Sequence, residues 1–106
     1  MDRRIKYTKK TIKDTFISLL SEKDIKKITV SEICNIADIN RATFYRYYLD
    51  VYDLLEKIEK ELVEKLKSVS RSSDNTIFSF STELLNVFLE NKELVKILFD
   101  TNNNIY

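Results

Sequence analysis

The chain has 106 residues, of which 43% are hydrophobic and 33% charged, and its formal net charge is +1. This length predicts one helix-rich globular domain, or one domain and part of a second. The absence of glycine, proline and histidine, with a single cysteine, excludes Gly-rich phosphate loops, a disulfide framework and most transition-metal sites. No apolar run is long enough to span a bilayer and no signal peptide is evident, so we expect a cytoplasmic protein.

The small net charge hides an asymmetry between the two halves of the chain. Residues 1–48 contain eleven Lys and Arg against six Asp and Glu, whereas residues 49–106 contain seven against eleven. The basic half is therefore the part that we expect to meet a polyanion. Random variation of charge along a soluble chain is the alternative.

Residues 2–7 predict a basic arm, followed by Thr8 as the N-cap of a first helix at about residues 9–22. Apolar residues recur at helical spacing from Ile12 to Leu20 and predict the buried side of this helix. Basic residues near its start are expected either to touch a backbone phosphate or to form a solvated face.

A second, short helix is predicted at residues 30–37, after a charged connection at residues 21–28. Thr29 and Glu32 have the spacing of a capping box, in which Glu32 reaches back to the N–H of Thr29. The inner side is expected to hold Ile33 with either Ile36 or Ala37. Cys34 is expected to be a small buried residue, which is favoured over a reactive or metal-binding role.

A turn at Asp38 and Ile39 leads to the segment richest in aromatic, basic and hydroxyl side chains, at residues 40–48. Asn40 is expected to cap a third helix, on which Phe44 and Tyr48 share the buried side. The other side carries guanidinium, hydroxyl and phenol groups, which suit nucleic acid. Two short helices joined by such a turn predict a helix-turn-helix.

Asp50 and Asp53 predict the cap of a long amphipathic helix from Val51 to about residues 68–70. Residues 70–74 have a loop-like composition, and another helix is predicted at residues 77–89, with a break at 90–92. Four phenylalanines in this region could line a ligand pocket, although a core role is favoured. These are Phe78, Phe80, Phe88 and Phe99.

The motifs in residues 8–60 resemble the TetR/AcrR family of bacterial transcriptional regulators. The resemblance rests on residues 11–16, 28–33, 37–48 and 53–55, with Thr43-Phe44-Tyr45 as the most specific part. The chain departs from the family at Asp38 and Ala42, where glycine is usual, and at Tyr47-Tyr48, where His-Phe is usual. Val51 stands where a phosphate-binding Lys is common.

The resemblance implies an all-α fold with a homeodomain-like three-helix head, a long linking helix four and one or two helices of an incomplete regulatory body. It also implies DNA binding as a homodimer and repression relieved by a small-molecule effector bound in the body. Members run to about twice this length, so the chain is expected to be a fragment or a truncated protein. The corresponding domains are residues 1–49, which bind DNA, and residues 50–106.

The leading hypothesis is a sequence-specific DNA-binding regulator that acts on a double-stranded operator, with no enzymatic activity, cofactor, metal or membrane partner. The alternative is a co-regulator or helical interaction module that does not bind DNA. Arg41 and Thr43 are expected to face base edges, and Tyr45, Arg46 and Tyr47 to hold phosphates. The full set of predicted DNA-binding residues is Thr29, Asn40, Arg41, Ala42, Thr43, Tyr45, Arg46 and Tyr47.

Overall fold

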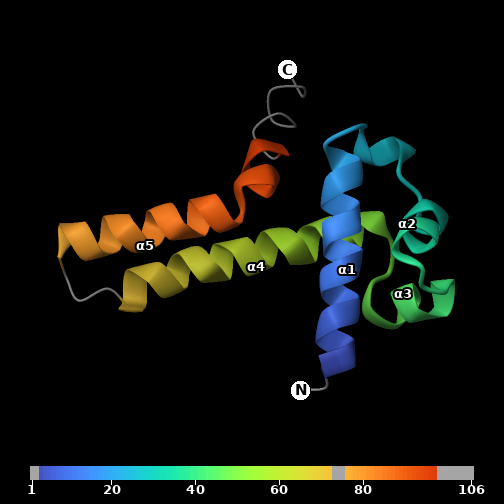
Figure 1. Cartoon of the computed structure of the whole chain (residues 1–106), viewed down its shortest axis with the longest axis horizontal. Helices are drawn as coiled ribbons and strands as arrows, with labels where there is room; N and C mark the ends of the chain where they lie inside the picture. The colour runs from blue at the N-terminus through green and yellow to red at the C-terminus, as the bar shows by residue number, and fades with distance from the viewer. Residues whose placement is uncertain (1–2, 73–75, 98–106) are drawn as a thin grey trace. The chain divides into compact units, whose positions relative to one another are not determined.

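A computed structural model of the chain describes residues 3–72 and 76–97. Every regular element in these residues is helical, which confirms the all-α prediction (Figure 1). The elements are α1 (Arg3–Leu20), the 3₁₀ helix η1 (Ile25–Lys27), α2 (Val30–Ala37), α3 (Arg41–Tyr47), α4 (Val51–Ser72) and α5 (Ile77–Glu90). No helix among them is long and apolar enough to cross a membrane.

The chain forms two compact units that divide within α4, between Lys57 and Ile58. The first unit contains α1, η1, α2, α3 and the first turns of α4. The second contains the rest of α4 and α5. The boundary predicted at residues 49 and 50 stays a prediction, since this division describes packing alone.

The first helix begins earlier than its sequence pattern predicted. Residues 3–7 belong to α1 and do not form an arm, so Thr8 lies inside the helix and is not its cap. Arginine and lysine are good helix formers, and neither glycine nor proline interrupts the segment. At its other end α1 stops at Leu20, two residues before the predicted end.

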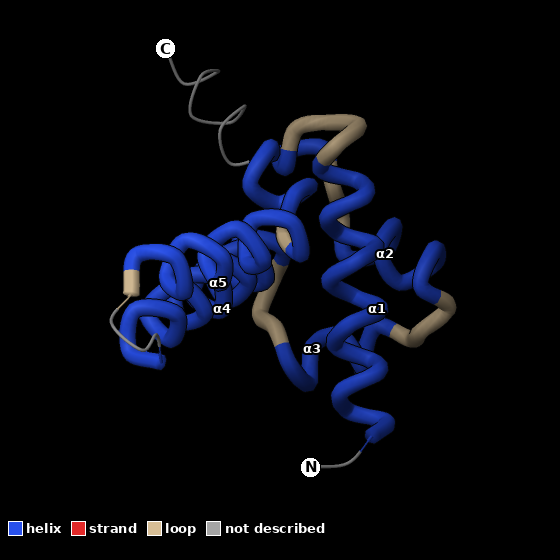
Figure 2. Tube along the Cα trace, turned by 60° about the vertical axis from the view of Figure 1, so that its left-hand side comes forward, coloured by secondary structure: helices blue, strands red, loops and turns tan. Residues whose placement is uncertain are grey.

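The core of the first unit is built from one side of each helix. α1 packs on α2 and α2 packs on α3 (Figure 2). The buried apolar residues of this unit are Ile12, Phe16, Leu19, Ile28, Ile33, Cys34, Phe44, Tyr48, Val51 and Leu54. Ile36 is 59% exposed, whereas Ala37 is partly buried, so Ala37 is the residue that joins Ile33 on the inner side of α2.

The connection between α1 and α2 contains a helical turn that its charged sequence did not predict. Asp24 caps η1 by accepting the N–H of Lys26 at 2.9 Å, and Ile28 at the end of the connection is buried. The carboxylate of Glu32 pairs with Lys23 Nζ at 2.6 Å. The predicted bond from Glu32 back to the N–H of Thr29 is not formed, and Glu32 Oε2 binds Lys23 instead.

α4 begins as predicted and continues past its predicted end. The side chain of Asp50 accepts the N–H of Asp53 at 2.8 Å, which confirms the cap. At the other end, residues 70–72 are helical and do not belong to a loop. The remainder of the predicted loop, Ser73 and Asp74, lies outside the described residues.

α5 in the second unit has the predicted bounds within one residue. Thr76 caps it, and the predicted break falls at Asn91, whose N–H donates to the carbonyl oxygen of Val87 at 3.1 Å. Residues 92–97 are again helical, with Leu94 and Ile97 buried.

The phenylalanines of α5 do not form the predicted core. Phe78 is 82% exposed, and Phe80 and Phe88 are also exposed. Phe99 lies outside the described residues. Helical spacing creates an apolar side on α5, but only a partner surface can bury it.

Candidate nucleic-acid interface

The turn between α2 and α3 is set by residues at both of its ends. The hydroxyl of Thr29 accepts the N–H of Glu32 at 3.1 Å and starts α2. α2 ends at Asp38, in the predicted turn, and this residue takes the left-handed conformation with φ 57° and ψ 50°. The N–H groups of Asp38 and Ile39 both donate to the carbonyl oxygen of Cys34. This closes α2 and redirects the chain without a glycine.

α3 starts at the predicted cap and is anchored by one ring. Asn40 Oδ1 accepts the N–H of Thr43 at 3.1 Å. Phe44 is fully buried, and its ring centre lies 5.5 Å from that of Tyr48, which is also buried. The predicted core roles of Phe44 and Tyr48 are confirmed, and they fix which side of α3 faces outward.

The outward side of α3 contains the residues that sequence analysis selected. Arg41, Ala42 and Arg46 are exposed, Tyr45 is 47% exposed, and Thr43 and Tyr47 are partly buried. We call these residues, with the exposed cap Asn40, the α3 surface. Thr29 is exposed as well, but it lies at the start of α2 and not on α3. None of the predicted DNA-binding residues is fully buried.

The charge of the α3 surface is positive. Its helix contains two arginines and no acidic residue. Arg41 also acts on the buried Cys34: burial raises the pKa of the Cys34 thiol, and the charge of the Arg41 guanidinium opposes this in smaller measure. Cys34 is thus a buried core thiol, as predicted, and no group of three acidic, His or Cys side chains in the described residues could hold a metal.

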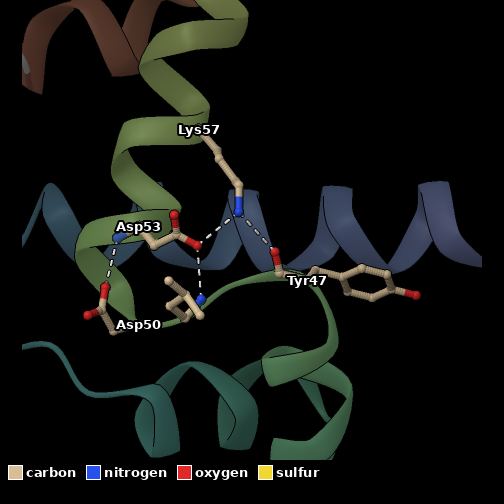
Figure 3. A network of polar contacts seen from close by, with 5 residues as sticks. Tyr47, Asp50, Asp53 and Lys57 are labelled. Carbon is tan, nitrogen blue, oxygen red and sulfur yellow. Dashed lines mark hydrogen bonds and ion pairs between the residues drawn. The ribbon is translucent and has the colours of Figure 1, made fainter.

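A polar network closes the C-terminal end of α3 (Figure 3). Lys57 Nζ donates to the carbonyl oxygen of Tyr47 at 3.3 Å and to Asp53 Oδ2 at 2.9 Å. The same carboxylate accepts the N–H of Leu49 at 2.9 Å. The N–H of Leu49 and the ammonium of Lys57 hold the pKa of Asp53 below its ordinary value. The Tyr47 ring points away from this network.

Sequence reasoning did not predict that two lysines, Lys57 and Lys9, contact the C-terminal end of α3. Lys57 lies four residues after Asp53, and this helical spacing could have indicated their ion pair. Lys9 lies with its ammonium 5.2 Å from the centre of the Tyr47 ring. No local pattern indicates that contact, because the two residues are distant in sequence and meet only through the fold.

Comparison with known proteins gives one relative. The chain is 33% identical over 81 residues to an uncharacterized HTH-type transcriptional regulator, YxbF, of Bacillus subtilis (strain 168). The chain is a distant relative of an HTH-type regulator. The match covers 74% of this chain and 21% of YxbF, so the chain spans about a fifth of the relative's length. No protein-family profile matches the chain, and no solved structure matches it.

Proposed function

We propose that the chain is a DNA-binding transcriptional regulator that places α3 in the major groove. The observation that carries this proposal is the α3 surface, a positively charged, hydroxyl-rich helix side held outward by the buried Phe44. α2 and the left-handed turn at Asp38 supply the other parts of a helix-turn-helix. The similarity to an HTH-type regulator supports the same function.

The residues of the α3 surface divide by their place on the helix. Arg41 and Thr43 lie in the first turn and would face base edges, where an Arg–guanine pair provides roughly 1–3 kcal/mol of discrimination. Tyr45, Arg46 and Tyr47 follow and would bind phosphates. Asn40 and Ala42 would lie against the duplex at the start of α3. Thr29 would bring the start of α2 to the backbone.

The finer parts of the proposal follow from the resemblance of residues 8–60 to the TetR/AcrR family. We propose a cytoplasmic repressor that binds a palindromic operator as a homodimer, with its recognition helices about 34–36 Å apart. A small-molecule effector bound in the C-terminal body would release the repressor from its operator. The residues after 57 would supply part of that body.

Fluorescence anisotropy with a labelled DNA duplex tests the proposal. Binding by the 106-residue chain should weaken as salt rises from about 50 to about 200 mM, with a slope of roughly 0.9 for each neutralised phosphate. Arg41→Ala combined with Tyr45→Ala should abolish binding while the helical circular dichroism persists. Lys60→Ala, which removes an exposed cation from α4, is the matched control. Salt-independent binding by the wild-type chain would refute phosphate contact.

A second candidate function is supported by the exposed apolar side of α5. Leu85 is 58% exposed and Leu89 61% exposed, beside the exposed Phe88. Such a surface suits a helical protein partner, as in a co-regulator that does not bind DNA. DNA binding by the wild-type chain and partner binding by the Arg41→Ala, Tyr45→Ala variant distinguish the two functions. A co-regulator would show no DNA affinity as wild type, and the double variant would still bind its protein partner fully.

A further inference from the structure

Lys9 of α1 and Tyr47 of α3 form a contact that extends the α3 surface. The ammonium of Lys9 lies 5.2 Å from the centre of the Tyr47 ring, within the range of a cation–π interaction. Lys9 is exposed and Tyr47 is partly buried. The contact therefore lies at the solvent boundary, where α1 approaches the C-terminal end of α3.

This contact leaves the charge of Lys9 available. A neutral ring attracts the ammonium without cancelling its charge, whereas a carboxylate partner would neutralise it. The neighbouring Lys10 shows the contrast, because its ammonium is paired with Asp14 at 2.6 Å. Within the described residues, the Tyr47 ring is the partner found for Lys9.

The ring of Tyr47 is placed to act together with Lys9. The backbone carbonyl of Tyr47 is held by Lys57, and its ring extends away from that network (Figure 3). An ammonium and a phenol hydroxyl are both hydrogen-bond donors to phosphate oxygens, and the ammonium bond is charge-assisted. A ring that is fixed at its backbone end restricts where the ammonium of Lys9 can lie.

We propose that Lys9 binds a DNA backbone phosphate next to the C-terminal end of α3, with Tyr47 as the residue that positions it. The inference rests on the proposed DNA binding and deepens it. The interface then runs from the α3 surface onto α1, and α1 contributes charge contacts without reading bases.

The test measures the salt dependence of binding by the full 106-residue chain, with a mixed-sequence DNA duplex of about three helical turns. Lys9→Ala should reduce the salt slope by roughly 0.9 and weaken binding about fivefold to tenfold near 0.1 M salt. Lys9→Arg should restore the slope, since it keeps a cation at the ring. Lys10→Ala removes the same charge one residue away and should keep the wild-type slope.

Two variants of Tyr47 test its positioning role. In a Tyr47→Leu background, Lys9→Ala should change the slope less than it does in the wild type, because Lys9 is no longer held. In a Tyr47→Phe background, which keeps the ring, Lys9→Ala should have its full effect. Thermal melting of each variant checks that the chain is folded.

The outcomes separate this inference from the proposed function. A steep wild-type slope that Lys9→Ala and Lys10→Ala reduce equally, or not at all, would overturn the role of Lys9 and leave DNA binding intact. A wild-type chain with no salt-dependent affinity would overturn both. Equal effects of Lys9→Ala in the leucine and phenylalanine backgrounds would overturn the positioning by Tyr47.

Discussion

Lys57 closes the end of the α3 helix at Tyr47, whose carbonyl oxygen lies 3.3 Å from the Lys57 ammonium nitrogen. The last carbonyls of a helix lack partners within the helix, and the end of the helix carries partial negative charge. The Lys57 ammonium, supplied by α4, gives one of these carbonyls a hydrogen-bond partner and places a positive charge at the end of the helix. Asp53 links the same ammonium to the N–H of Leu49, so the bend from α3 to α4 is held by side chains of α4.

Replacing Lys57 should loosen this bend. Lys57→Met keeps the length of the side chain but removes the bonds to Tyr47 and Asp53, so we expect the melting temperature to fall by about 2–4 °C. The difference from wild type should shrink at high salt, which screens exposed ion pairs. Lys60→Met, on the exposed side of the same helix, is the control, and equal melting of both variants would contradict the assigned role.

Asp53 should make stability depend on pH in the acid range. The N–H of Leu49 and then the ammonium of Lys57 hold its pKa below the ordinary value. The unfolded carboxyl thus takes up a proton at a higher pH than the folded one. The stabilisation by Asp53 is present at neutral pH and is lost as the pH falls through the lowered folded pKa.

The Asp53→Asn variant tests this dependence. It should melt below the wild type at about pH 7, and the two melting curves should converge as the pH approaches about 2. NMR titration of the Asp53 carboxyl carbon gives the folded pKa directly. An ordinary aspartate pKa would contradict the network in Figure 3.

Phe44 and Tyr45 are adjacent residues with opposite expected effects. Phe44 is fully buried, so Phe44→Ala should lower the free energy of unfolding by about 3–5 kcal/mol, measured by urea denaturation. Tyr45 is 47% exposed, so Tyr45→Ala should cost about 1 kcal/mol or less and act mainly on DNA binding. A large stability loss from Tyr45→Ala would show that its ring belongs to the core.

Asp38 should tolerate glycine and resist a β-branched residue. Its φ of 57° lies in the left-handed region, where a branched Cβ clashes with the backbone. Asp38→Val should reduce the free energy of unfolding by about 1–2 kcal/mol, whereas Asp38→Gly should cause no comparable loss. Chemical denaturation of both variants gives the comparison, and equal losses would mean that the turn does not depend on this conformation.

Cys34 should react slowly while the chain is folded. Burial raises the pKa of its thiol, and the thiolate is the reactive form. Alkylation by iodoacetamide at neutral pH should be slower than in urea by about tenfold or more. Mass spectrometry of the labelled chain measures both rates, and similar rates would place Cys34 at the surface.

Sequence reasoning succeeded where a few neighbouring residues control the structure. Thr29 and Asn40 cap their helices through bonds that span three residues, and the predicted turn falls at Asp38, where the bonds that close α2 span four and five residues. Reasoning failed at the start of α1, where strong helix formers outweighed the cap signal of Thr8. It also failed for the phenylalanines of α5, which were expected in the core but are exposed, because an apolar helix side does not indicate which surface buries it. The DNA-binding roles stay predictions.

The amino-acid sequence by itself determined the starts of α2, α3 and α4, the turn between α2 and α3, and the burial of Phe44, because periodicity and capping act within one element. Only the tertiary structure decided the contacts between elements. It placed Lys9 over Tyr47, Lys57 at the end of α3, and Lys23 beside Glu32. Each of these pairs joins two segments, and the distance between the lysine ammonium and its partner depends on how the helices pack rather than on sequence spacing.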